Sequence, residues 1–316
     1  MDPMSKATEL LQAADRCHDD DPAQGASLLR QIDPDALNPG QRPLYAFLVN
    51  HVLSEKLGQF AEAWLRQQAV LSACRDEATL PVLRHAGVAA RLAGDHTGEA
   101  HVAARLGGLA HVDHARAAEL IVLAAAGFEM PRANGESAAR IALAAMAPLA
   151  QDAAWHAAGG LDAAAAVATN NIASDLVERP VDDLQLPSVR EAMALAAEWS
   201  QRFWGRAGQW VNHERAHYLR AMVANALGDA AAAESQARAG LVLLANFDAA
   251  SNEKVDMAFL RSELAHALGR LGRAADAQVE RAQADATIDA LDDAGITQWY
   301  RNRVARQQAL DAAAAA

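Results

Sequence analysis

Four glycines mark the points at which one helix-favouring stretch of the chain gives way to the next. They are Gly58, Gly94, Gly228 and Gly272, and the middle two are each followed by aspartate. Glycine adopts the left-handed backbone conformation that commonly ends a helix, and aspartate is a favoured cap for the start of another. The glycines are 36 residues apart in the N-terminal pair and 44 apart in the C-terminal pair. Spacings of this size indicate a repeated unit of two helices.

The residues between these turns favour helix over strand. Alanine dominates a hydrophobic fraction of 52%, aromatic residues make up only 5%, and β-branched residues are sparse. Alanine is the strongest helix former, whereas strands are enriched in β-branched and aromatic residues. At 316 residues the chain is long enough for two domains or for one elongated array of repeats. We therefore predict an all-α fold.

Small residues occur where two helices of a repeat must approach closely. In residues 214–245, ERAHYLRAMVANALGDAAAAESQARAGLVLLA, they are Ala221, Ala233 and Gly240. This stretch resembles a tetratricopeptide repeat, which has small residues at these three places and a Gly-Asp turn between its helices. The other turns have related surroundings, namely Gly87 and Ala100 beside Gly94, Ala265, Ala277 and Ala284 beside Gly272, and Phe60 and Ala63 after Gly58. The resemblance implies helical hairpins stacked as a right-handed α-solenoid, although the spacings exceed the usual period of about 34 residues.

The remaining helices follow from the positions of helix breakers. Between the second and third glycine turns the pattern predicts helices near 115–128, 136–149, 151–178 and 189–205, with Gly159-Gly160 as one of the breakers. Residues 2–15 and the basic segment 299–310 predict a first and a last helix. The run Asp19-Asp20-Asp21-Pro22 predicts a turn followed by a helix cap.

The segment RPVDDLQLPS, residues 179–188, is the clearest break at the level of domains, and its Ser188 is a candidate cap for the next helix. We therefore divide the chain into N-terminal helical repeats at 1–180 and C-terminal repeats at 181–311 that continue the first part. The terminal alanines, 312–316, are predicted to be disordered.

A stack of helical hairpins presents a concave surface built from its first helices, and this surface usually binds a partner. In the tetratricopeptide register the corresponding positions are Leu48, Val52 and Glu55; Arg84, Val88 and Arg91; Tyr218, Met222 and Asn225; and Ser262, His266 and Arg270. The predicted function is therefore a non-catalytic binding or scaffold protein that recognises a protein or peptide in a concave groove.

The C-terminal half carries a second resemblance. From Ala168 onward, ATNNIASDLVERP and RFWGRAGQWVNHERAHYLRAMVANALGDA are similar to an uncharacterised bacterial family of tetratricopeptide-like proteins, which implies a helical repeat and no known activity. The predicted binding groove accordingly comprises Asn170, Asn171, Trp204, Trp210, Arg215, Tyr218, Met222, Asn225 and His266. Two alternatives stay open: the tryptophans fill a helix–helix core and the asparagines bridge helices, or the region senses a small molecule.

Residues 213–217, HERAH, match the H-E-x-x-H pattern of zinc proteases. Histidines at i and i+4 can reach one metal ion from a single helix face, and the glutamate between them can activate the bound water. This predicts an alternative function as a zinc- or iron-dependent enzyme, with His213 and His217 as metal ligands and Glu214 as the catalytic base. No third-ligand motif accompanies them, so the preferred prediction has no cofactor and no catalysis.

Charge and cysteine content exclude several other classes. A net charge of −12 repels a phosphate backbone, which argues against nucleic acid as the partner. Two cysteines without CxxC spacing and the absence of a secretory leader pattern predict a cytoplasmic protein, and no apolar run reaches the length of a membrane span. No Walker A loop, GxSxG elbow or GxGxxG turn is present. A homodimer remains open.

Overall fold

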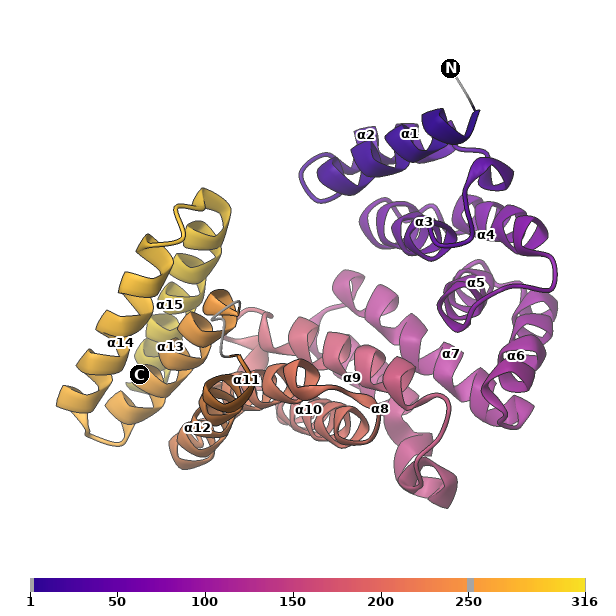
Figure 1. Cartoon of the computed structure of the whole chain (residues 1–316). Helices are drawn as coiled ribbons and strands as arrows, with labels where there is room; N and C mark the ends of the chain where they lie inside the picture. The colour runs from indigo at the N-terminus through magenta and orange to yellow at the C-terminus, as the bar shows by residue number, and fades with distance from the viewer. Residues whose placement is uncertain (1–2, 249–252, 316) are drawn as a thin grey trace. The chain divides into compact units, whose positions relative to one another are not determined.

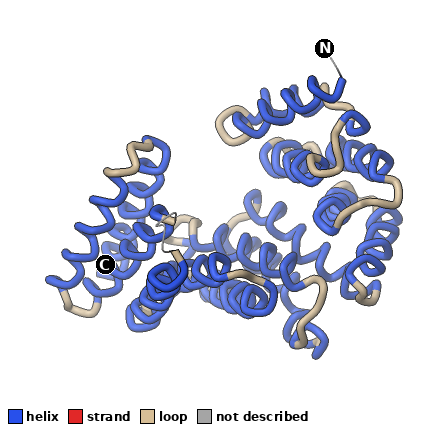
Figure 2. Tube along the Cα trace, viewed as in Figure 1, coloured by secondary structure: helices blue, strands red, loops and turns tan. Residues whose placement is uncertain are grey.

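The computed structural model describes residues 3–248 and 253–315, and these residues form helices joined by turns and loops, without a strand (Figures 1 and 2). The chain divides into two compact units. Unit 1 comprises Met1–Arg132 and Ala144–Ala164, and unit 2 comprises Ala133–Leu143 and Ala165–Ala316. The break expected at 180–181 therefore falls within unit 2.

Unit 1 is built from consecutive helical hairpins. Its elements are α1 (Pro3–Cys17), α2 (Pro22–Arg30), η1 (Pro34–Ala36), α3 (Arg42–Leu48), the π-helical η2 (Val49–Lys56), α4 (Phe60–Cys74), α5 (Leu80–Leu92), α6 (His96–Ala110), α7 (His114–Glu129), η3 (Met130–Arg132) and η4 (Ala153–His156). Partners α1 and α2, η2 and α4, and α5 and α6 pack in pairs, and α3, α5 and α7 contact one another in succession. Contact between successive first helices is the packing expected of stacked hairpins.

Unit 2 continues the same pattern of packing. Its elements are α10 (Pro187–Ala207), α11 (Trp210–Leu227), α12 (Ala230–Phe247), α13 (Lys254–Arg270), α14 (Ala274–Asp289), α15 (Ala294–Ala315) and η5 (Asp183–Gln185), while α8 (Gly135–Gln151) and α9 (Asp162–Val177) each run across a division between the units. Hairpins α11–α12 and α13–α14 stack, and α15 packs on α13 and α14. The fold class is thus all-α, made of stacked helical hairpins.

The four glycine turns are confirmed. The backbone angle φ is +68° at Gly58, +76° at Gly94, +83° at Gly228 and +76° at Gly272, and each glycine separates the two helices of a hairpin. The aspartates that follow the middle two glycines cap the next helix, since Asp95 accepts a hydrogen bond from the Gly98 amide and Asp229 from the Ala232 amide. Local backbone chemistry therefore sets these turns.

The small residues lie where helices approach most closely. A Cβ atom on Gly87 would be 2.5 Å from Ile121 Cδ1 of α7, and one on Gly240 would be 2.8 Å from Leu260 Cδ2 of α13. Ala221 and Ala233 are completely buried. The packing predicted from the repeat register is therefore present in these hairpins.

Three local expectations differ from the structure. The single helix expected over 151–178 is broken into η4 and α9, because the Gly159-Gly160 loop lies between them. Ser188 does not cap α10: the helix already begins at Pro187, and the Ser188 hydroxyl donates to Glu136. The alanine tail is helical through Ala315, and Ala316 lies outside the described residues.

Two buried clusters form the core of unit 2 and pack together the helices on which the candidate site lies. One buried cluster of alanine and leucine, Ala221, Ala237, Leu244, Leu260, Leu264 and Leu268, joins α11, α12 and α13. A second, Ala258, Phe259, Ala284, Ile288 and Tyr300, joins α13, α14 and α15. Among the described helices, none combines the length and apolar character needed to cross a bilayer.

Candidate binding site

The histidines of the HERAH segment serve different neighbours. His213 is half-buried, and its Nε2 lies 2.9 Å from the Trp204 carbonyl oxygen. The Nδ1 atom of His217 lies 2.7 Å from Gln236 Oε1 on α12 and 3.2 Å from Gln201 Nε2 on α10. Within the described residues, no group of three convergent ligand side chains includes either histidine. Both rings thus tie α11 to its neighbours.

Glu214 lies between them, but it is completely buried and faces Asp256 of α13. Within the part of the chain that the structure describes, neither of its oxygens accepts a hydrogen bond. Burial, together with the neighbouring Asp256 carboxylate, raises the pKa of Glu214 to about 9. Its carboxyl is therefore protonated at neutral pH and is poorly suited to act as a general base.

The tryptophans and asparagines of the predicted groove do not meet in a common pocket. Trp204 and Trp210 are half-buried, and Trp210 stacks on Phe247 of α12 with ring centroids 6.1 Å apart. Asn170 is half-buried and Asn171 is exposed, and no hydrogen bond from either amide is found among the described residues. Trp210 therefore packs where α11 meets α12, while Asn171 faces solvent.

Arg215, Tyr218 and Met222 follow successive turns of α11 but have separate roles. Arg215 donates to Asp256 of α13 at 2.8 Å and to Glu253 at 3.2 Å. Tyr218 packs against both buried clusters of unit 2, and Met222 is buried. Arg215 and Tyr218 thus join α11 to α13.

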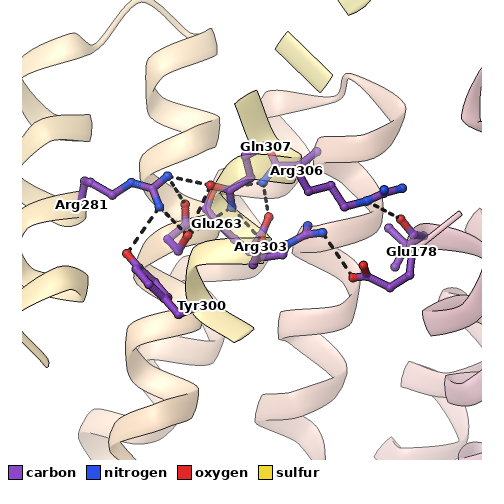
Figure 3. Close-up of polar contacts among 10 residues, drawn as sticks. Glu178, Glu263, Arg281, Tyr300, Arg303, Arg306 and Gln307 are labelled. Carbon is purple, nitrogen blue, oxygen red and sulfur yellow. Dashed lines mark hydrogen bonds and ion pairs between the residues drawn. The ribbon is translucent and has the colours of Figure 1, made fainter. Parts of the chain in front are cut away.

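Asn225 and His266 both belong to a hydrogen-bonded polar region of unit 2. The Asn225 amide donates to Glu263 Oε2 at 2.7 Å, and His266 Nε2 lies 2.9 Å from Asp311 of α15. Glu263 is completely buried and accepts a hydrogen bond from Arg303 Nε at 2.6 Å. Figure 3 shows Glu263 and Arg303 with Arg281 and Gln307, where side chains of α13, α14 and α15 converge. We call Glu263, Arg303, Gln307, Ser262 and Arg281 the inner network.

The electrostatics of the inner network are balanced. Burial acts to raise the pKa of Glu263, but the charge and hydrogen bonds of Arg303 and the Asn225 amide outweigh it, so the pKa is lowered. Burial likewise acts to lower the pKa of Arg303, and the Glu263 carboxylate overcomes that effect. Both groups therefore stay ionised as a buried ion pair.

Arg281 of α14 extends the inner network toward the surface. Its guanidinium donates to Gln307 Oε1 at 2.6 Å and to Ser262 Oγ at 2.7 Å (Figure 3). Tyr300, which lies beside it, donates its hydroxyl proton to Asp285 at 2.7 Å. These bonds hold the side chains of α14 and α15 in fixed orientations above α13.

The last helix covers the first-helix positions of α13. Arg303, Gln307 and Asp311 recur every four residues on one face of α15. They contact Glu263, Ser262 and His266 in turn. The α13 positions that the repeat register assigns to a partner, Ser262 and His266, are thus contacted by a segment of the same chain.

The same helix also reaches the end of α9. Arg306 Nε donates to the Val177 carbonyl at 3.0 Å and a second nitrogen donates to the Arg179 carbonyl, while Arg303 lies 3.6 Å from Glu178 (Figure 3). Carbonyls at a helix end lack intrahelical donors, and arginine satisfies them. α15 therefore joins α9, α13 and α14 within unit 2.

Between α13, α14 and α15 lies a pocket of about 850 Å³. Ala265 and Gly269 of α13 are among the residues that line it, and neither has a large side chain. Its walls carry Arg281, Asp285, Asp289, Tyr300, Arg301, Gln308 and Asp311, among others. Asp289 and Arg301 are exposed, and neither has an ion pair or hydrogen bond among the described residues. The pocket thus offers one unpaired charge of each sign.

Of the residues in the predicted groove, His266 lines this pocket, whereas the residues of α14 and α15 that form its other walls were not part of the prediction. The available signal was the basic helix near 299–310, in which Arg303 and Gln307 share one face. The sequence did not reveal that the buried Glu263 of α13 is the ion-pair partner of Arg303 on this helix.

No protein-family model matches this chain, and no curated protein matches it in sequence comparison.

Proposed function

We propose that this protein is a non-catalytic helical-repeat binding protein that recognises a peptide segment of a protein partner in the pocket between α13, α14 and α15. The observation that carries the proposal is the inner network, which fixes polar side chains along the wall of a pocket of about 850 Å³. Binding sites combine a largely preformed concavity with a few well-placed polar groups, and their volumes are commonly about 300–1,000 Å³.

The charges at the pocket rim indicate the chemistry of the partner. Asp289 on α14 and Arg301 on α15 are unpaired within the described chain, whereas Asp285 and Arg281 are already hydrogen-bonded. A segment that carries both a basic and an acidic side chain can pair with the first two without breaking the other bonds. Ion pairs at an exposed rim set specificity and orientation more than affinity.

Two glycines allow the pocket to be blocked with a matched control. Gly269 lines the pocket near the end of α13, and Gly205 lies near the end of α10 away from it. A Cβ atom would meet nothing within 4 Å at either position. Gly269→Trp therefore fills the pocket without an initial clash, and Gly205→Trp places the same side chain on a comparable helix surface.

The test is selection of a random displayed-peptide library on the wild-type chain, followed by fluorescence-anisotropy binding of the selected peptides. We expect Gly269→Trp to weaken binding at least about tenfold, which corresponds to about 1.4 kcal/mol, and Gly205→Trp to bind like the wild type. Selected peptides that bind Gly269→Trp as tightly as the wild type would place the binding surface elsewhere. Failure to enrich any peptide over an unrelated protein would exclude peptide recognition.

A further inference from the structure

A second polar cluster lies in unit 1, where the turn after α1 meets η2. Nε2 of His18 lies 3.2 Å from Asp19 Oδ2, and Nε2 of His51 lies 3.2 Å from Asp19 Oδ1. One ligand atom from each of these three residues lies within 4.8 Å of the other two. Segments more than 30 residues apart in sequence thus bring two imidazoles to one carboxylate.

The other ring nitrogen of each histidine has its own hydrogen-bond acceptor. Nδ1 of His18 contacts the Asp15 carbonyl oxygen, and Nδ1 of His51 lies 2.7 Å from Glu55 Oε2. A carbonyl or carboxylate oxygen can only accept, so each Nδ1 carries a proton. Each Nε2 therefore faces the Asp19 carboxylate, and either a proton or a metal cation between the nitrogen and the carboxylate makes that contact favourable.

This arrangement has the features of a metal site. Zinc binds nitrogen and oxygen ligands at about 2.0–2.2 Å in a tetrahedron, which separates ligand atoms by about 3.3 Å. Histidine ligands usually donate their other N–H to a carboxylate or a backbone carbonyl, as His18 and His51 do. We propose that His18, Asp19 and His51 bind one divalent zinc-class ion, with water completing its coordination and Glu55 positioning His51.

The surroundings are compatible with entry of the ion. The Asp19 side chain is 63% exposed, so solvent reaches the carboxylate. Lys56 Nζ lies 3.0 Å from Asp19 Oδ1 and competes with the metal for that oxygen, but its long side chain is partly exposed and can turn away. Phe47 stacks on the His51 ring with centroids 5.4 Å apart and restricts its rotation.

The bound ion would fasten the first hairpin to the second. His18 and Asp19 belong to the turn between α1 and α2, while His51 belongs to η2, against which α2 packs. A ligand that binds the folded state alone stabilises that state. Zinc is therefore expected to raise the unfolding temperature of the wild-type chain.

The test uses the full chain, freed of metal by a chelator and titrated with zinc chloride by calorimetry and by thermal unfolding. We expect one zinc ion per chain, and a loss of that binding of at least about 100-fold in His18→Gln and in His51→Gln. Glu55→Gln keeps all three ligands and is expected to bind about 10- to 100-fold more weakly. His96→Gln, which replaces a histidine whose side chain is 85% exposed, should bind like the wild type.

Two further measurements separate this site from other sources of binding. The His213→Gln, His217→Gln double variant should retain one zinc ion, and cobalt(II) in place of zinc should give a visible spectrum that disappears in His51→Gln. The proposal is overturned if the wild-type chain binds no zinc, or if both His18→Gln and His51→Gln, shown to be folded by circular dichroism, bind it unchanged. Loss of zinc in the double variant but not in His51→Gln would assign the metal to α11 instead.

Discussion

Two glutamates show how partners, and not burial alone, decide the state of a carboxyl group. Glu214 and Glu263 lie on the first helices of consecutive hairpins, and both are completely buried. Glu263 faces Arg303 and has a lowered pKa, whereas Glu214 faces Asp256 and has a pKa raised to about 9. At neutral pH one is therefore a carboxylate and the other a neutral acid.

The raised pKa of Glu214 predicts a stability that falls with rising pH. From about pH 4.5 to 9 the folded state holds a proton that the unfolded state releases, so the contribution of Glu214 is most favourable below about 4.5 and is lost as pH rises toward 9. Glu214→Gln removes this dependence. Relative to the wild type, we expect it to gain at least about 1 kcal/mol of unfolding free energy between pH 5 and 8.

Urea unfolding at pH 5, 6.5 and 8 measures this difference. Glu191→Gln is the control, because Glu191 of α10 is exposed and has no hydrogen bond among the described residues. An equal pH dependence in wild type and Glu214→Gln would show that Glu214 ionises normally in the folded protein.

Among helices and turns, the features that could be predicted from the sequence were those determined by residues close together in the chain. The four glycine turns were found because a left-handed backbone requires glycine at a known place relative to two helices. The cap at Ser188 was wrong because Pro187 starts the helix one residue earlier and leaves the serine free to bond Glu136. The docking of α15 was missed because it depends on pairs such as Glu263 and Arg303, which are 40 residues apart.

Substitutions at two glycines of unit 1 distinguish how glycine affects stability in a left-handed turn from how it affects stability inside a helix. Gly94 has φ +76° with no atom within 4 Å of an added Cβ, and Gly108 lies in α6 with equally open surroundings. We expect Gly94→Ala to destabilise the protein by about 1–2 kcal/mol, because only its backbone conformation is unfavourable for alanine. Gly108→Ala should stabilise it by about 0.5–1 kcal/mol.

Urea unfolding of the two variants tests this contrast. A Gly94→Ala variant as stable as the wild type would mean that the turn relaxes to another conformation. Destabilisation by Gly108→Ala would mean that its helix surface is covered.

At the scale of the whole chain, the compact units do not divide where the sequence changes character. The Pro-rich segment at 179–188 suggested a boundary, but residues 133–143 and 165–180 belong to unit 2. Arg179 donates to the Ala133 carbonyl, and α15 returns to the carbonyls of Val177 and Arg179. These contacts join segments 46 to 129 residues apart, a range that local sequence patterns do not reveal.

This organisation predicts the behaviour of fragments. A fragment of residues 133–316 retains the acceptors of Arg306 at the end of α9, whereas one of residues 181–316 lacks them. We expect the longer fragment to unfold cooperatively in urea and the shorter one to be less stable by at least about 2 kcal/mol, since it loses two partners of a half-buried arginine and the packing of α9. Circular dichroism measures the unfolding of both fragments. Equal stability of the two would show that the C-terminal repeats are independent of α9.

The pairing of Glu263 with Arg303 also has a consequence for biosynthesis. A ribosome completes α13 well before it adds Arg303, which comes 40 residues after Glu263. During that interval the carboxylate lacks its ion pair with Arg303, and burying it without that partner is unfavourable. The nascent α13–α14 hairpin must therefore keep this side chain hydrated, or protonated, until α15 has been synthesised. The last step in packing α13 against its neighbours is thus coupled to the synthesis of α15, whose Arg303 pairs with the Glu263 carboxylate.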